Sequence, residues 1–262
     1  MRRAALFAGL TVLATASSAR AQDSVKPVCA DRPGKGAAPC TVDKGHWQVE
    51  VDVADFTRDR SAGATVETSL LASTNVKYGI SDRLDLELNI TPLQSQRAEG
   101  GGRASGLGDT IARAKFALIQ GDTAVSLLPY VKLPTARRDL GNGAVEEGLS
   151  VPVSVNLPGQ LTLALTPEID ALKDAFGSGR HAAYQFAGGL GRPLTATFTG
   201  SVELWDAEIL EPSGHASQAS LDLGLAWMPV SQQTLQVDGG LNLGLNHATP
   251  QIQVYVGLSR RF

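Results

Sequence analysis

A two-residue alternation of apolar and polar side chains runs through the chain from Trp47 to its last residue, Phe262. The stretch 83–90 shows it most clearly, in the order Arg83, Leu84, Asp85, Leu86, Glu87, Leu88, Asn89 and Ile90. Because successive side chains of a β-strand point to opposite faces, the pattern predicts strands with one apolar and one polar face. A helix would spread the same four aliphatic side chains around its axis.

The alternation recurs, and short turn-like links between the stretches alternate with mostly longer ones. Short turns at one rim and longer loops at the other, with both termini on the short-turn side, are typical of outer-membrane barrels. We therefore predict about twelve strands, near residues 47–53, 72–78, 83–90, 109–119, 125–133, 149–156, 161–170, 183–191, 198–204, 220–227, 235–246 and 252–259.

A soluble β-sandwich shows a similar alternation, so the two folds have to be separated by other features. The polar face carries charges in the middle of strands, which suits a wet lumen. Aromatic side chains gather toward strand ends, as interfacial rings do in a lipid-facing band, at Trp47, Tyr78, Trp205 and Trp227. The last strand ends in Phe262, which resembles the signal that outer-membrane barrels present to their assembly machinery. These features favour an all-β transmembrane antiparallel barrel.

The membrane dictates how such a sheet must close. An unpaired backbone group in hydrocarbon costs several kcal/mol, so the first strand, near Trp47, is expected to pair with the last, near Tyr255. Leu86 is expected to face lipid near the bilayer middle. Glu87 is expected to face water, where a charge reversal would mainly change selectivity.

The first residues predict export. A basic start, an uncharged stretch from Ala4 to Ala16 and an Ala-x-Ala site indicate a signal peptide over residues 1–21, cleaved after Ala21. Residues 22–45 lack periodicity and are predicted to be a periplasmic N-terminal segment, followed by the barrel over 46–262. In an oxidising compartment the two cysteines, Cys29 and Cys40, are expected to form a disulfide. Two thiols at this spacing form neither a zinc site nor a Cys-x-x-Cys motif, and we expect no metal and no cofactor.

Several ordered motifs resemble the phenol-degradation meta-pathway family of outer-membrane, transporter-like barrels. The resemblance covers nearly the whole mature chain. It implies an association with aromatic degradation and a role in uptake of such compounds across the outer membrane, with no established site residues. The matching stretches are 31–33, 44–50, 108–110 with Arg113 and Lys115, 128–135, 141–143, 238–242 and 255–262.

Charged side chains on the polar face form the main candidate site. Basic groups come from the earlier strands, whereas the later strands supply mainly acids. Two interpretations remain open: a transverse field that orients a polar or aromatic acid in the pore, or a structural ion-pair network that fills a narrow barrel. The candidates are Glu50, Arg83, Asp85, Glu87, Arg113, Lys115, Lys132, Glu168, Glu203, Asp222 and Asp238, among which Arg113, Lys115 and Lys132 are expected to form a basic wall opposite Glu203, Asp222 and Asp238.

The leading functional hypothesis is a channel for small hydrophobic or aromatic molecules, with membrane lipid, the assembly machinery and a small solute as partners. The alternative is a closed structural or adhesive barrel, in which residues 22–45 either plug the lumen or act only as a tether. Removal of residues 1–21 leaves 20 basic against 26 acidic residues, which argues against a nucleic-acid binder. No Gly-x-Ser-x-Gly motif occurs, and the four histidines are interpreted as loop or rim residues, so we expect no enzyme and regard a hydrolase as the least favoured reading. They are His46, His181, His215 and His247.

Overall fold

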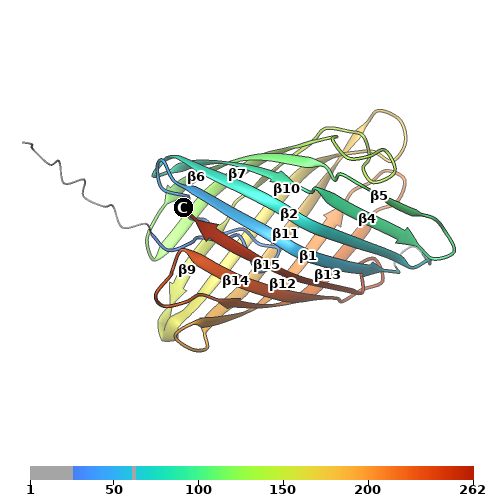
Figure 1. Cartoon of the computed structure of the whole chain (residues 1–262). Helices are drawn as coiled ribbons and strands as arrows, with labels where there is room; N and C mark the ends of the chain where they lie inside the picture. Colours follow the sequence, from blue (N-terminus) through green and yellow to red (C-terminus); the bar gives the residue numbers. More distant parts are fainter. Residues whose placement is uncertain (1–25, 61–62) are drawn as a thin grey trace, which may run out of the picture.

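The alternating strands close into an antiparallel β-barrel (Figure 1), in a computed structural model that describes residues 26–60 and 63–262. The predicted signal peptide lies outside the described residues. None of the helices in the described residues is long and apolar enough to cross a membrane. The elements are β1 (Trp47–Asp59), β2 (Val66–Ser81), β3 (Leu84–Ile90), β4 (Leu93–Ala98), β5 (Arg103–Gly106), β6 (Thr110–Ile119), β7 (Thr123–Leu133), β8 (Glu146–Ser150), β9 (Val153–Leu157), the short 3-10 helix η1 (Pro158–Gln160), β10 (Leu161–Lys173), β11 (Arg180–Pro193), β12 (Phe198–Ile209), β13 (Ala216–Trp227), β14 (Leu235–Gly244) and β15 (Ile252–Arg261).

The fifteen strands of the described chain occupy twelve positions around the barrel, which correspond to the twelve predicted strands. Three of these positions hold two short strands each. β3 and β4 both pair with β2 and occupy one position. β6 pairs with β3 and β5 pairs with β4, so β5 and β6 share the next position. β8 and β9 share a third position in the same way, because both pair with β7 and with β10. β1 pairs with both β2 and β15, with Asp55 opposite Tyr255, so the predicted closure of first strand on last is confirmed.

The links follow the predicted plan of short turns at one end and longer loops at the other. The C-terminus and the beginning of β1 lie at the short-turn end (Figure 1). One predicted loop, 92–107, is wrong in part, because β4 and β5 extend the barrel wall as a hairpin and leave only a short glycine turn at 99–102.

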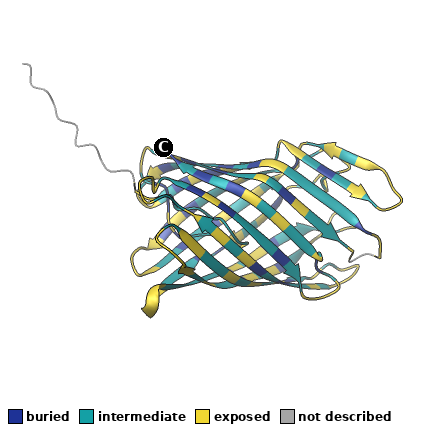
Figure 2. Cartoon of the chain, turned by 60° about the horizontal axis from the view of Figure 1, so that its bottom comes forward, coloured by how far each residue is buried: buried dark blue, intermediate teal, exposed yellow. Residues whose placement is uncertain are grey.

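Buried, intermediate and exposed positions follow one another along the strands (Figure 2), and burial is inverted relative to a soluble protein. Among the largest fully buried side chains are Lys77, Lys115, Gln48 and Asp85, all on the inner face. Large aliphatic side chains cover the outside, for example Leu204 with 57% of its surface exposed. An apolar outer face over a charged interior is what hydrocarbon around the barrel and water within it require.

Two outer-face predictions need correction. Trp205 shares the parity of Glu203 and points into the lumen, where the Lys35 ammonium lies 3.8 Å from its ring centroid. Leu86 does face outward, but it pairs with Tyr78, only three residues from the short-turn end of β2. Leu86 therefore lies near the membrane interface and not near the bilayer middle.

Candidate functional site

The lumen holds part of the chain itself. Residues 28–40, which we call the luminal segment, enter at the short-turn end, where the Val28 amide donates to the Gln233 carbonyl at 2.8 Å. The segment returns to the same end at Thr41, whose hydroxyl donates to the Asp82 carbonyl at 3.1 Å. The predicted disulfide between Cys29 and Cys40 is present and closes this loop at its base.

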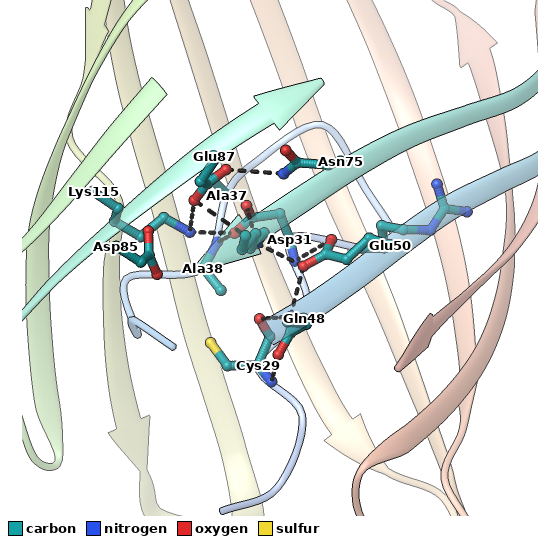
Figure 3. A network of polar contacts seen from close by, with 12 residues as sticks. Cys29, Asp31, Ala37, Ala38, Gln48, Glu50, Asn75, Asp85, Glu87 and Lys115 are labelled. Atoms are coloured by element: carbon teal, nitrogen blue, oxygen red, sulfur yellow. Dashed lines mark hydrogen bonds and ion pairs between the residues drawn. The ribbon is translucent and has the colours of Figure 1, made fainter. Parts of the chain in front are cut away.

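Asp31 anchors the luminal segment to the basic side of the lumen (Figure 3). Its carboxylate lies 2.5 Å from Lys77 Nζ and 2.7 Å from Lys115 Nζ, on β2 and β6. Burial alone would raise the pKa of the Asp31 carboxyl, but the two ammonium groups outweigh it and lower that pKa below its ordinary value. Asp31 is therefore charged at neutral pH.

The same two lysines also bind strand carboxylates. Lys77 Nζ lies 2.6 Å from Glu50, and Lys115 Nζ lies 3.2 Å from Glu87. Glu87 in addition accepts a 2.9 Å hydrogen bond from Asn75. Three carboxylates and two ammonium groups thus form one buried network, in which removal of a single partner leaves a charge uncompensated at a cost of about 3–5 kcal/mol.

Arg32 and Lys35 anchor the luminal segment to the acidic side. The guanidinium of Arg32 pairs with Asp52 on β1 and with Asp238 on β14, the latter at 2.8 Å. Lys35 Nζ lies 3.7 Å from Asp222 on β13. The segment therefore presents Asp31 to the lysines on one side of the lumen and Arg32 and Lys35 to the carboxylates on the other.

Backbone and aromatic contacts complete the docking. The amides of Lys35 and Gly36 donate to Glu203 at 2.8 and 3.2 Å, and the Gly34 amide donates to the Tyr255 hydroxyl at 3.0 Å. The Gln236 amide donates to the Arg32 carbonyl at 3.0 Å. The luminal segment is thus held along its length and not only at its charged side chains.

The structure places the predicted lumen charges in distinct environments. Asp85 is fully buried and accepts a 2.8 Å hydrogen bond from the Val42 amide. Lys132 lies 2.7 Å from Glu146 and 3.3 Å from Asp109, near the long loops. Glu168 accepts a 3.1 Å hydrogen bond from Gln185.

Two parts of the predicted site are wrong. Arg83 is exposed in the turn before β3, where its guanidinium lies 3.5 Å from the Leu118 carbonyl, and it does not line the lumen. Arg113, Lys115 and Lys132 do lie on the neighbouring strands β6 and β7, but they do not form the expected positive surface, because Lys115 and Lys132 are paired with acids. Sequence reasoning missed the anchoring roles of Asp31, Arg32 and Lys35, although their mixed charges were a visible signal in an aperiodic segment.

Two cavities flank the luminal segment. One, of about 520 Å³, lies toward the short turns beside Pro33, Thr162 and Gly191. The other, of about 220 Å³, lies toward the long loops beside Arg113 and Tyr130. Ala37 borders both, so the tip of the segment separates them.

At the outer rim, one histidine links two long loops. His181 Nδ1 lies 2.9 Å from Asp174 and 3.2 Å from Glu211, which belong to the β10–β11 and β12–β13 links. His215 lies 2.7 Å from Glu208 nearby. Both are rim residues, away from the luminal segment.

These features define an outer-membrane-type β-barrel whose lumen holds its own N-terminal segment. Comparison with known families then identifies it: the chain belongs to the family described as "Putative MetA-pathway of phenol degradation", whose model matches residues 30–262. The match begins within the luminal segment. No curated protein matches the chain.

Solved structures show the same fold. An outer membrane channel from Pseudomonas putida F1 is similar with a TM-score of 0.68 and 16% identity, over 88% of this chain and 99% of that one. The NanC porin gives 0.54 and 11%, over 81% and 98%. The KdgM porin, solved in complex with disordered oligogalacturonate, gives 0.51 and 10%, over 82% and 99%.

Proposed function

We propose that the protein is an outer-membrane channel for small hydrophobic or aromatic molecules, closed at rest by the luminal segment. The observation that carries this proposal is the division of a charge-lined lumen into two cavities by a segment that ionic contacts hold in place. The family's link to phenol degradation supports the solute class. The names of two similar structures, a channel and a porin, support transport.

The anchoring chemistry suits a gate. The disulfide joins two residues of the luminal segment itself. The segment is bound to the wall by ion pairs and hydrogen bonds, which water can replace without a covalent change. Displacement of Lys35 and Ala37 would join the two cavities into one path. The freed charges would remain in a wet lumen, where solvent compensates them better than in a dry core.

Single-channel recording in planar bilayers tests the gate. A variant that lacks residues 26–40 should show a larger and steadier conductance than the full barrel, because the two cavities become continuous. Far-UV circular dichroism and heat-modifiable migration of both refolded proteins control for barrel formation. Equal conductance of the two proteins would contradict a closing role for the luminal segment.

A closed structural or adhesive barrel is the alternative, and the occupied lumen is the observation that favours it. Under that alternative, the variant without residues 26–40 would fold, yet neither it nor the full barrel would conduct ions or admit an aromatic solute into liposomes. Under the channel proposal, the shortened variant admits the solute.

The compartment follows from the same proposal. We propose export by a signal peptide over residues 1–21, a periplasmic position for the short-turn end, and the outer membrane as the final location. Phe262 is 61% exposed at the end of the closing strand, where it is accessible to the assembly machinery that we propose as its partner.

A further inference from the structure

One cation that faces the lumen has no carboxylate at ion-pair distance among the described residues. Arg32, Lys35, Lys77, Lys115 and Lys132 all form ion pairs. Arg113, one inward position from Lys115 on β6, forms neither an ion pair nor a hydrogen bond within the part of the chain that the structure describes. Glu87 lies opposite Arg113 in the strand register, but its carboxylate binds Lys115 and Asn75 instead.

Arg113 lines the 220 Å³ cavity on the long-loop side of the luminal segment. Arg113 interacts electrostatically with Glu87 and Glu168 but forms no direct pair with either. Its planar donors are therefore available to an anion and match a carboxylate in bidentate geometry. Lys132 and Glu146, which border the same cavity, bind each other at 2.7 Å and neutralise one another. Lys35 borders the cavity too and lies 3.7 Å from Asp222. Among the cations that line this cavity, Arg113 is therefore the one with no carboxylate at ion-pair distance in the described chain.

The rest of the cavity is amphipathic. Ile111 and Leu128 border it, and Leu128 is a buried aliphatic side chain on an inner face that is otherwise mainly polar. The ring of Tyr130 adds an aromatic surface, and its hydroxyl is turned away to Asp170 at 2.6 Å. A cavity of about 150 Å³ is enough to hold benzene in another protein, so about 220 Å³ accommodates one ring with a carboxylate.

We propose that this cavity binds monocyclic aromatic carboxylates, with Arg113 as the group that recognises the anion and with Ile111, Leu128 and Tyr130 around the ring. This inference rests on the proposed function, whose solute class it narrows. The sequence predicted that Arg113, Lys115 and Lys132 would attract the anion together. Lys115 and Lys132 are paired with acids, so we assign this role to Arg113 alone. Glu168 borders the cavity as well and would repel the same anion when charged.

Equilibrium dialysis of the detergent-purified full chain with benzoate, and with benzyl alcohol as a neutral analogue of similar size, tests the assignment. Arg113→Gln should weaken benzoate binding about tenfold or more, since a charge-assisted bidentate pair is lost. Its effect on benzyl alcohol should be less than about twofold. Arg83→Gln, which removes the same charge from an exposed turn, is the matched control and should change neither ligand.

Glu168→Gln separates recognition from structural support. If Glu168 only repels the anion, this variant should bind benzoate as tightly as the wild type or more tightly, whereas damage to the cavity would weaken both ligands. The proposal is overturned if wild-type protein does not bind benzoate, if Arg113→Gln binds it as Arg83→Gln does, or if Arg113→Gln weakens both ligands equally. These results leave the conductance test untouched, so the channel proposal stands or falls separately.

Discussion

At the scale of single residues, an absent side chain matters as much as a charged one. Gly224 on β13 faces the luminal segment, and a Cβ there would lie 2.7 Å from Pro33 Cγ and 2.5 Å from Ser201 Oγ. The Ser201 hydroxyl can rotate away, but Pro33 is fixed between Arg32 and Gly34, which both bind the wall. The glycine therefore provides the space in which the segment docks.

Gly224→Ala should loosen the luminal segment without damage to the barrel. The added methyl group overpacks the contact with Pro33, at a cost of about 1–3 kcal/mol to docking. Frequent channel openings and faster proteolysis within residues 26–45 are the expected readouts. Gly191→Ala is the matched control, because a Cβ at Gly191 meets only the Gly200 carbonyl oxygen, at 4.0 Å. Identical behaviour of the two variants would show that Pro33 is not held through this contact.

The environment of Glu87 differs from the one predicted. The alternation assigns Glu87 to the wet face, where a charge reversal was expected to be mild. The carboxylate instead lies fully buried between Lys77 and Lys115, at 3.9 and 3.2 Å. An arginine there would place three cations together without enough acids, so the change would harm the fold and not only selectivity.

At the scale of strands, the two faces of one element experience different solvents. Leu204 lies in the middle of β12 and is 57% exposed on the outer face, between Gly188 and Leu221 of the neighbouring strands. Its neighbour Glu203 points inward and binds the luminal segment. A charged substitution should therefore be tolerated better at positions that face the lumen than at positions that face outward.

Leu204→Arg should impair folding into lipid bilayers by about 2–4 kcal/mol, the cost of arginine near the bilayer midplane. Thr162→Arg, an inward position beside the 520 Å³ cavity, should cost far less because water reaches it. Urea titration of both variants in lipid vesicles measures the free energy of unfolding. A similar loss for the two would mean that the outer face of β12 does not contact lipid.

At the scale of the whole molecule, the closed sheet and its apolar outer face together suit the barrel to a membrane. The pairing of β1 with β15 leaves no open edge at the seam, and the aliphatic outer face gives the closed sheet an apolar exterior. A protein with this surface is stable where hydrocarbon replaces water. The luminal segment adds the ion pairs of Asp31, Arg32 and Lys35 to those that the wall strands form among themselves.

Extraction of native membranes tests whether the barrel is integral to the membrane. The protein should stay in the membrane pellet after carbonate or high-salt washes and should dissolve only in detergent, because its outer face is buried in lipid. A soluble periplasmic protein from the same cells should be released by the washes. Release of this protein alongside it would be incompatible with an integral barrel.

The strands, their number, the closure of the sheet and most inward-facing charges could be predicted from the amino-acid sequence. This was possible because side-chain parity is a local property, visible in any eight residues such as 83–90, and because the membrane permits few ways to complete a sheet. The parity of Trp205 with Glu203 was also visible, although its position near a strand end suggested an interfacial ring.

Which charges form ion pairs depends on the folded barrel and could not be predicted from the sequence. Asp31 meets Lys77 and Lys115 across 46 and 84 residues of chain, and Arg32 meets Asp238 across 206. No periodicity links an aperiodic segment to such distant partners; the closed wall brings them together, and the segment's own charges then select the side to which each residue binds. Within the described chain, Arg113 forms no ion pair for the same reason, since the nearby Glu87 binds Lys115 and Asn75 in contacts that exist only in the folded barrel.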